Sequence, residues 1–315
     1  MSTLYLDRND LEVSAESRHL RLRAADGLST TVPMRLLERV VVRGRVGLDS
    51  SLLGLLAEAG IAITFLGARS HKRRAILLGS GGQDASRRLL QYRALHDATL
   101  KVEIARQVLD RKLGASLAGI DTMLEQRPDC RHALHKSRRT VAAMQSGLPA
   151  GDCDTMLGLE GAAAHAWFQA LAAVLPEQWG FAGRNRRPPR DPFNSCLSLA
   201  YTLIHSDACQ VAWSVGLDPM LGFLHEPLHG RESLACDLVE PLRPRIDLVF
   251  WRAFAERRFQ SHHFSDTAQG CYLTKPGRQR FYPLWEAHAA PWRRYLRLTC
   301  VKLVKALHDA KNEAA

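Results

Sequence analysis

The sequence lacks any uninterrupted run of about 18 apolar residues, the length that a membrane-spanning helix needs. Its longest apolar-rich stretch, from Met156 to Leu175, is interrupted by Glu160, His165 and Gln169. The first residues also lack a basic segment followed by an apolar one, which argues against a cleaved secretion signal. These absences predict a cytoplasmic protein with no membrane partner.

Paired cysteine motifs are absent as well. The seven cysteines are scattered, and no two of them form a C-x-x-C pair, so neither a zinc ribbon nor a dithiol redox motif is predicted. Because disulfides are rare in the cytoplasm, we expect reduced and mostly buried thiols. They are Cys130, Cys153, Cys196, Cys209, Cys236, Cys271 and Cys300.

Acidic residues are few relative to basic ones. The 315 residues include 32 Asp and Glu against 43 Lys and Arg, a net charge of +11. This balance indicates a polyanionic partner, most simply nucleic acid. The 46% hydrophobic and 24% charged residues are typical of a globular protein. A chain of this length is expected to form about two domains.

The first part of the chain, residues 1–80, is predicted to be a β-rich domain with one short helix over Ser50–Glu58. Asp49 or Ser50 can cap the start of this helix, and Gly60 lies just past its end. The Gly/Ser-rich residues 79–84 predict a linker, because small residues do not stiffen a chain. The predicted strands are Thr3–Asp7, His19–Arg23, Arg39–Arg43, Ile61–Phe65 and Ala75–Leu78.

Beyond the linker, residues 85–315 show helical periodicity. Asp191 followed by Pro192 is typical of a helix start, and Gly216 of the end of that helix. The predicted fold class is therefore α+β, with a small N-terminal β-rich domain and a larger all-α C-terminal catalytic domain. The other predicted helices are Ser86–Leu113, Arg131–Gln145, Thr155–Val174, Ser233–Arg257 with breaks at Pro241 and Pro244, and Leu284–Lys311.

Glu160 is the most informative acidic residue. It lies in a helix that is apolar nearly all round, and such a helix is expected to be buried. A buried carboxylate needs a cationic partner or becomes protonated. Gly158 and Gly161 flank it at a cost in helix stability, which favours close approach of a backbone, an ion or a ligand. A structural ion pair with an arginine is the alternative.

A second cluster contains His225, Asp237 and Glu240. If Ser233 opens a helix, the two carboxylates project from one face and repel each other. A divalent cation would relieve this repulsion, and His225 would add a nitrogen ligand. Such a donor set suits Mg²⁺ or Mn²⁺ rather than structural zinc. A solvated acidic helix start is the alternative.

The same segment contains an H-E-x-x-H pattern, His225-Glu226-Pro227-Leu228-His229, as in zinc metalloproteases. That motif needs a continuous helix, which would place both histidines on one face. Pro227 would break such a helix. A zinc metalloprotease is therefore a minor alternative.

A proline-stiffened basic arm leads into the cap at Asp191. Its four arginines are candidates for gripping DNA phosphates, and a solvated charge run is the alternative. They are Arg184, Arg186, Arg187 and Arg190.

Several segments carry a family resemblance through their order and spacing. They are Leu157–Gly161, Arg186–Asn194 leading to Ser198–Tyr201, Gly216–Pro219, Gly222–His225 and Ser233–Pro244. Together they resemble the CRISPR-associated integrase/endonuclease family, the first-numbered Cas protein and catalytic subunit of spacer acquisition. The β-rich start, linker and helical remainder resemble that family's two-domain layout.

The resemblance implies a metal site formed by Glu160, His225 and Glu240, with Asp237 as a neighbouring catalytic acid and candidate general base. The implied activity is metal-dependent DNA strand transfer, in which a 3′-OH of foreign DNA attacks a phosphodiester at the repeat boundary of a CRISPR array. The same site acting with water implies endonuclease activity.

The partners implied by the resemblance are double-stranded DNA, as protospacer and repeat, and a second copy of the chain in a homodimer. A small ferredoxin-like second-numbered Cas protein would bridge two such dimers. The alternative from another class is a non-catalytic basic DNA-binding protein whose acidic residues are structural.

Overall fold

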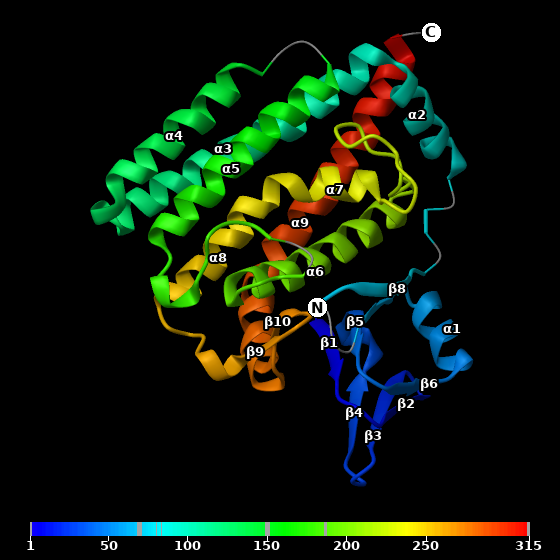
Figure 1. Cartoon of the computed structure of the whole chain (residues 1–315). Coiled ribbons are helices and arrows are strands. Elements are labelled where there is room, and N and C mark those ends of the chain that lie inside the picture. Colours follow the sequence, from blue (N-terminus) through cyan, green and yellow to red (C-terminus); the bar gives the residue numbers. More distant parts are fainter. Residues whose placement is uncertain are drawn as a thin grey trace. The chain divides into compact units, whose positions relative to one another are not determined.

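The computed structural model describes residues 2–67, 71–79, 81–82, 84–148, 152–185 and 188–313. These residues form two units, each described separately here (Figure 1). One comprises Met1–Asp84 with Trp213–Gly216, and the other comprises Ala85–Ala212 with Leu217–Ala315. The boundary at Asp84 falls at the end of the predicted 79–84 linker, of which Ser80 and Gln83 lie outside the described residues.

The first unit contains two four-stranded sheets. One has the order β1-β5-β7-β8, with β8 antiparallel to β7 and the other pairs parallel. The second has the order β4-β3-β2-β6. The strands are β1 (Ser2–Asp7), β2 (Leu11–Glu16), β3 (His19–Ala24), β4 (Ser29–Pro33), β5 (Leu37–Arg43), β6 (Val46–Leu48), β7 (Ala62–Leu66) and β8 (Arg73–Leu77).

The core of this unit contains side chains from both sheets and from helix α1 (Ser50–Glu58), including Val13, Val40, Leu52 and Ile63. The side chain of Asp49 accepts a hydrogen bond of 2.7 Å from the Leu52 amide and so caps α1, as predicted. Strands β2, β4 and β6 were not predicted. The sequence of β2 alternates apolar and polar residues, and its first residues alternate between buried and exposed. This pattern could have predicted the strand.

The second unit is mainly helical. The predicted helix over 86–113 is two helices, because Asp97 interrupts it and caps the second one through a 3.0 Å bond from the Leu100 amide. The helices are α2 (Ala85–His96), α3 (Ala98–Gln126), α4 (Arg131–Ser146), α5 (Cys153–Val174), α6 (Pro192–Ser214), α7 (Ser233–Val239), α8 (Arg243–Ala255) and α9 (Lys275–Glu313).

The helix boundaries follow the capping residues. Asp191 caps α6 through a 2.8 Å bond from the Asn194 amide, as predicted, and Gly216 has a left-handed φ of 80° after its end. The predicted break in 233–257 is the 3₁₀ turn η4 (Glu240–Leu242) between α7 and α8. Helix α9 begins earlier than predicted and continues through Pro283 and Pro291.

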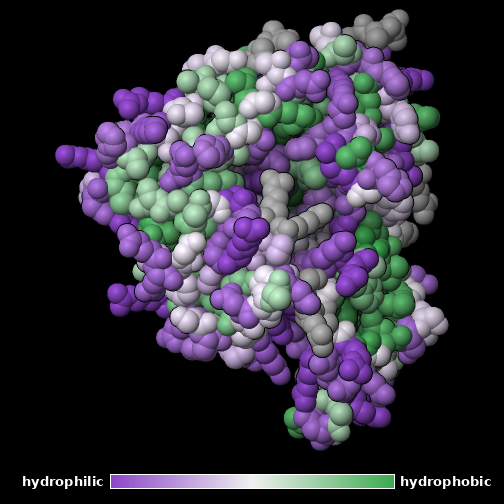
Figure 2. All heavy atoms as spheres, viewed as in Figure 1, coloured by the Kyte–Doolittle hydropathy of each residue, from purple (hydrophilic) through white to green (hydrophobic). Residues whose placement is uncertain are grey.

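The predicted fold class is confirmed, with one addition. The helical region also contains an antiparallel hairpin of β9 (Phe264–Thr267) and β10 (Gly270–Leu273), so this region is not wholly α-helical. Hydrophilic side chains cover much of the face shown in Figure 2, with hydrophobic patches among them. Within the described residues, no helix combines the length and apolarity needed to cross a membrane.

Candidate functional site

The centre of the candidate site is Lys112, a lysine on the buried face of α3. Its ammonium group hydrogen-bonds to Oε1 of Glu160 on α5, and it lies 2.5 Å from Oε2 of Glu240 at the end of α7. The Lys112 side chain is only 8% exposed. The fold thus brings the two predicted carboxylates to one positive charge.

Glu240 is the more deeply buried of the two acids. Burial alone would raise its pKa, but the nearby charges of Arg243 and Lys112 outweigh burial and hold the pKa well below its usual range. Arg243 donates from Nε to the second carboxylate oxygen of Glu240 at 2.8 Å. His225 also lowers this pKa, which places the imidazole within electrostatic reach of Glu240. Glu240 is therefore ionised in the folded protein at neutral pH.

Asp237 fixes the loop that carries His225. Its Oδ2 accepts the amides of Phe223 at 2.6 Å and Leu224 at 3.0 Å, while its Oδ1 accepts the His225 amide at 3.0 Å. Oδ1 also lies 2.7 Å from Nδ1 of the His225 ring. A carboxylate on Nδ1 fixes the ring and leaves Nε2 to serve as a ligand.

Gly222 allows this loop to lie against the start of α7. A Cβ at this position would be 2.6 Å from the carbonyl oxygen of His225 and 2.7 Å from that of Ser233, closer than a side chain can approach. The local sequence therefore determines where His225 is held.

The donor set fits a hard divalent cation. Glu160 and Glu240 supply carboxylate oxygens and His225 an imidazole nitrogen, which suits Mg²⁺ or Mn²⁺. The structure supports this fit, because the Lys112 ammonium already lies between the two carboxylates. These acids can share one cation.

Three expectations about Glu160 and its surroundings were wrong. The helix around it, α5, is exposed along one face, and the Glu160 side chain is 21% exposed. Among the described residues, no heavy atom outside the local chain lies within 4 Å of a Cβ position at Gly158 or Gly161, so these glycines serve no close backbone approach there. The cationic partner of Glu160 is Lys112 on α3 rather than the expected arginine.

The H-E-x-x-H pattern does not form a protease site. Residues 225–229 are not helical, and Glu226 pairs with Lys101 at 2.6 Å. His229 is exposed in the turn that follows. Residues 225–229, all of which the structure describes, therefore do not form the continuous helix that this motif needs.

The comparisons with known proteins agree with the resemblance. A model of the family described as CRISPR associated protein Cas1 matches residues 4–287. The chain belongs to the Cas1 family. Among its Cas1 relatives, CRISPR-associated endonuclease Cas1 1 of Thermodesulfovibrio yellowstonii is 32% identical over 294 residues, which cover 91% of each protein.

Solved structures show the same fold as this Cas1-family chain. A casposase bound to an integration product has a TM-score of 0.84 and 19% identity, covering 98% of this chain and 91% of that chain. A chain of a Cas6-RT-Cas1–Cas2 complex has a TM-score of 0.83 and 20% identity, covering 98% of this chain and 35% of that chain.

The arginine arm has two described members. Arg184 lies inside the unit, where its guanidinium bonds to Asn194 Oδ1 at 2.7 Å and Ser198 Oγ at 3.3 Å and lies 5.3 Å from the centre of the Tyr201 ring. This internal role differs from the predicted phosphate contact. Arg190 is exposed, as a DNA contact would require. The predicted contacts Arg186 and Arg187 lie outside the described residues.

A buried acid beside the site escaped the sequence reasoning. Asp247 on α8 accepts hydrogen bonds from Tyr201 at 2.5 Å and Trp167 at 2.8 Å. Burial raises its pKa to about 6 despite these bonds. Together with Lys112 and Glu160 it lines a cavity of about 20 Å³. Asp247 in an otherwise apolar helical stripe was the available signal.

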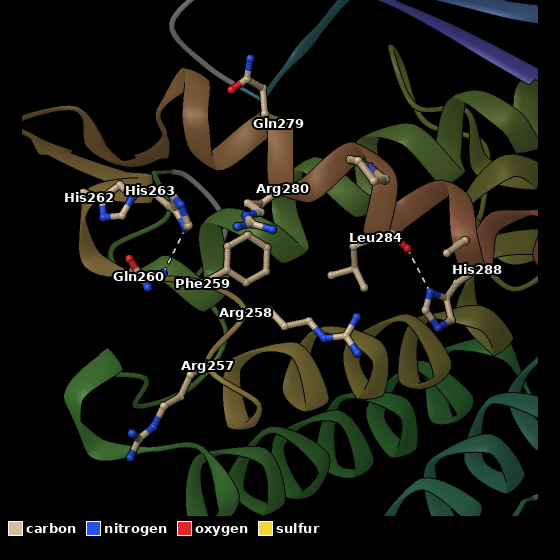
Figure 3. A pocket seen from close by; sticks show the side chains of 12 residues that line it. Arg257, Arg258, Phe259, Gln260, His262, His263, Gln279, Arg280, Leu284 and His288 are labelled. Atoms are coloured by element: carbon tan, nitrogen blue, oxygen red, sulfur yellow. Dashed lines mark hydrogen bonds between the residues drawn. The ribbon is translucent and has the colours of Figure 1, made fainter.

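A second, basic cavity of about 500 Å³ lies between the end of α8 and α9 (Figure 3). Its side chains include Arg257, Arg258, Arg280 and His288, and none of the described lining residues is acidic. Burial, and then the charges of His262 and Arg280, lower the pKa of His263 here. The sequence reasoning missed this cavity because its basic residues come from separate segments.

Arg257 is held in a conformation that usually favours glycine. Its φ is 57°, and it lies just after α8, where the Arg258 amide bonds to the Ala253 carbonyl at 2.9 Å. A non-glycine residue in this conformation costs about 1–2 kcal/mol. Strain of this kind is common at functional positions.

Proposed function

We propose that this Cas1-family chain is a metal-dependent DNA endonuclease and strand transferase of CRISPR adaptation, which inserts foreign DNA fragments into a CRISPR array for antiviral defence. The observation that carries the proposal is the convergence of Glu160 and Glu240 on the buried ammonium group of Lys112, with His225 within electrostatic reach of Glu240. These residues come from separate parts of the sequence.

In this proposal Glu160, His225 and Glu240 hold Mg²⁺ or Mn²⁺. The bound ion would polarise the phosphate and stabilise charge on the attacking or leaving oxygen. Asp237 holds the His225 ring in place, and Lys112 neutralises the two carboxylates before the ion binds. A 3′-OH of foreign DNA attacks the phosphodiester at the repeat boundary and forms a new P–O bond, while the P–O bond to the 3′-oxygen of the target strand breaks and that strand leaves with a free 3′-OH. Attack by water in place of the 3′-OH gives nuclease activity.

We place part of the DNA contact at the basic cavity around Arg257 and Arg280, and part at Arg190. Arginine at these positions would bind phosphate oxygens without reading sequence. The partners in this proposal are protospacer and repeat DNA, a second copy of the chain, and a Cas2 protein that bridges two dimers. The casposase bound to an integration product and the Cas6-RT-Cas1–Cas2 complex, which share this fold, support DNA and a Cas2 protein as partners. The DNA substrate implies a cytoplasmic site of action.

The rival function is DNA binding without chemistry, favoured by the fact that Lys112 and Arg243 already satisfy the acids. Single-turnover nicking and joining of DNA at saturating protein, with Mn²⁺, distinguishes the two. We expect His225→Ala and Glu160→Ala to slow the chemical step by several powers of ten, and the exposed-loop control His229→Ala to retain most of it. Activity retained in His225→Ala and Glu160→Ala would favour the structural role.

A further inference from the structure

A second group of possible metal ligands lies between α6 and the start of α7. It consists of His205, Cys209 and Glu232, whose donor atoms all lie within 4.8 Å of one another. Nε2 of His205 is 3.1 Å from Oε2 of Glu232. The His205 ring also hydrogen-bonds to the thiol of a fourth residue, Cys236. None of these four residues belongs to the candidate catalytic site.

The spacing places these donors in two facing pairs. His205 and Cys209 are four residues apart on α6, so both side chains lie on one face of that helix. Glu232 and Cys236 are also four apart, and the Cys236 amide bonds to the Glu232 carbonyl at 3.0 Å in the first turn of α7. His205, Cys209 and Glu232 therefore converge on one point, and the Cys236 thiol lies beside the His205 ring.

The chemistry of the cluster differs from that of the Glu160 site. Imidazole and thiolate are the ligands that zinc prefers, and a carboxylate completes many zinc sites. Zinc–ligand bonds of about 2.0–2.3 Å put neighbouring ligand atoms about 3.5 Å apart, so closure from the observed spacing needs shifts of roughly 1 Å. The Cys209 residue is 2% exposed, whereas the His205 side chain is 22% and the Glu232 side chain 27% exposed, so an ion can enter from that side.

We propose that His205, Cys209 and Glu232, with Cys236 as the fourth donor, form a structural zinc site that joins α6 to the start of α7. The two thiols lose their protons to the solvent when zinc binds. Helix α7 carries Asp237 and ends directly before Glu240. The zinc would therefore hold the segment that positions the catalytic acids, without taking part in DNA chemistry.

The test measures zinc on the full-length chain with the substitution Glu160→Ala as the reference, so that the other site cannot compete. The protein is stripped with a chelator, reconstituted with zinc, desalted and analysed for bound metal. We expect about one zinc per chain, released by an organomercurial that attacks thiolates. Adding Cys209→Ala or Glu232→Gln should weaken zinc binding about tenfold or more, while the control Cys300→Ala, a buried thiol on α9, should not.

Cobalt substitution gives a second measurement that does not depend on activity. A thiolate-to-cobalt charge-transfer band in the reference protein that is weaker in Cys209→Ala would show that the Cys209 sulfur binds the ion. If the Cys209→Ala variant, changed at a buried position, fails to fold, zinc binding by Glu232→Gln still tests the proposal. Absence of zinc from the reference protein, or equal zinc in Glu232→Gln and the reference, would overturn the proposal and leave a His205–Glu232 ion pair. Neither result bears on the DNA chemistry proposed above.

Discussion

Lys112 and Glu240 are 128 residues apart in the sequence, yet Nζ of the lysine lies 2.5 Å from Oε2 of the glutamate. The same ammonium group bonds to Glu160. One buried lysine therefore neutralises both carboxylates of the candidate metal site. It keeps the site stable without an ion, and it therefore reduces the effect of a divalent cation on the stability of the protein.

Replacing this lysine with an uncharged side chain should increase that effect. Lys112→Met leaves the buried Glu240 and the partly exposed Glu160 without their shared partner, and we expect a loss of about 3 kcal/mol in the free energy of unfolding. Mn²⁺ should then stabilise the variant more than the wild type, because ion binding to the native state adds stability. Urea unfolding with and without Mn²⁺ measures both effects. Lys112→Arg is the matched control, and equal Mn²⁺ responses in all three proteins would contradict the metal site.

Asp237→Asn separates a positioning role from a general base. The amide cannot accept all four hydrogen bonds, so we expect a stability loss of about 1–3 kcal/mol and a chemical step slowed about 10–100-fold. If Asp237 only positions His225, the pH–rate profile keeps its shape and the rate falls uniformly. Asp309→Asn, at an exposed position on α9, is the control. Disappearance of one limb of the profile in Asp237→Asn would identify a general base instead.

Asp247 should make the protein less stable as the pH rises through a defined window. Its pKa is raised to about 6 in the fold, against 3.8 unfolded, so between these values the native state binds more protons than the unfolded state. Stability from this group is therefore highest below pH 4 and declines until about pH 6, by roughly 2–3 kcal/mol. The measurement is the difference in unfolding free energy between wild type and Asp247→Asn from pH 4 to 7. A difference that does not change with pH would contradict the raised pKa.

Arg257→Gly should improve folding and weaken DNA binding together. Glycine relieves the left-handed conformation, and we expect a gain of about 1 kcal/mol. If the guanidinium contacts one phosphate, the slope of log affinity against log salt should become shallower by about 0.9. Arg18→Gly is the matched control, because Arg18 has a φ of 68° and is exposed in the other unit. Equal salt slopes for the two variants would argue against DNA contact at Arg257.

Local signals predicted those parts of the fold that depend on neighbouring residues. Asp49 and Asp191 each cap the helix that follows them, because a capping side chain needs only the next turn of backbone. Asp97 caps α3 in the same way, but apolar residues continue at helical spacing on both sides of it, so the sequence did not show that one helix ends and another begins there. Strand β4 carries little alternation of burial, so no periodicity marks it as a strand.

The candidate site could be predicted only in part. Glu160 is visible as a carboxylate in an apolar helix and Glu240 as an acid three residues from Asp237, and the fold brings both Glu160 and Glu240 to Lys112. Lys112 itself sits in a helical stripe that reads as ordinary core, and only the packing of α3 against α5 and η4 reveals its role. The burial of Glu160 was overestimated because the sequence of an apolar helix does not show which of its faces other helices cover.

The carboxylate of Asp237 accepts the amides of Phe223, Leu224 and His225, three consecutive residues of a segment without regular secondary structure. Those amides have no strand or helix of their own, so their hydrogen bonds depend on Asp237 of α7, while the buried Phe223 and Leu224 side chains add packing. Unfolding of α7 would release the loop, and release of the loop would leave a buried charge unpaired. The loop and the helix therefore open as one cooperative unit, and local fraying cannot move His225 while leaving Asp237 in place.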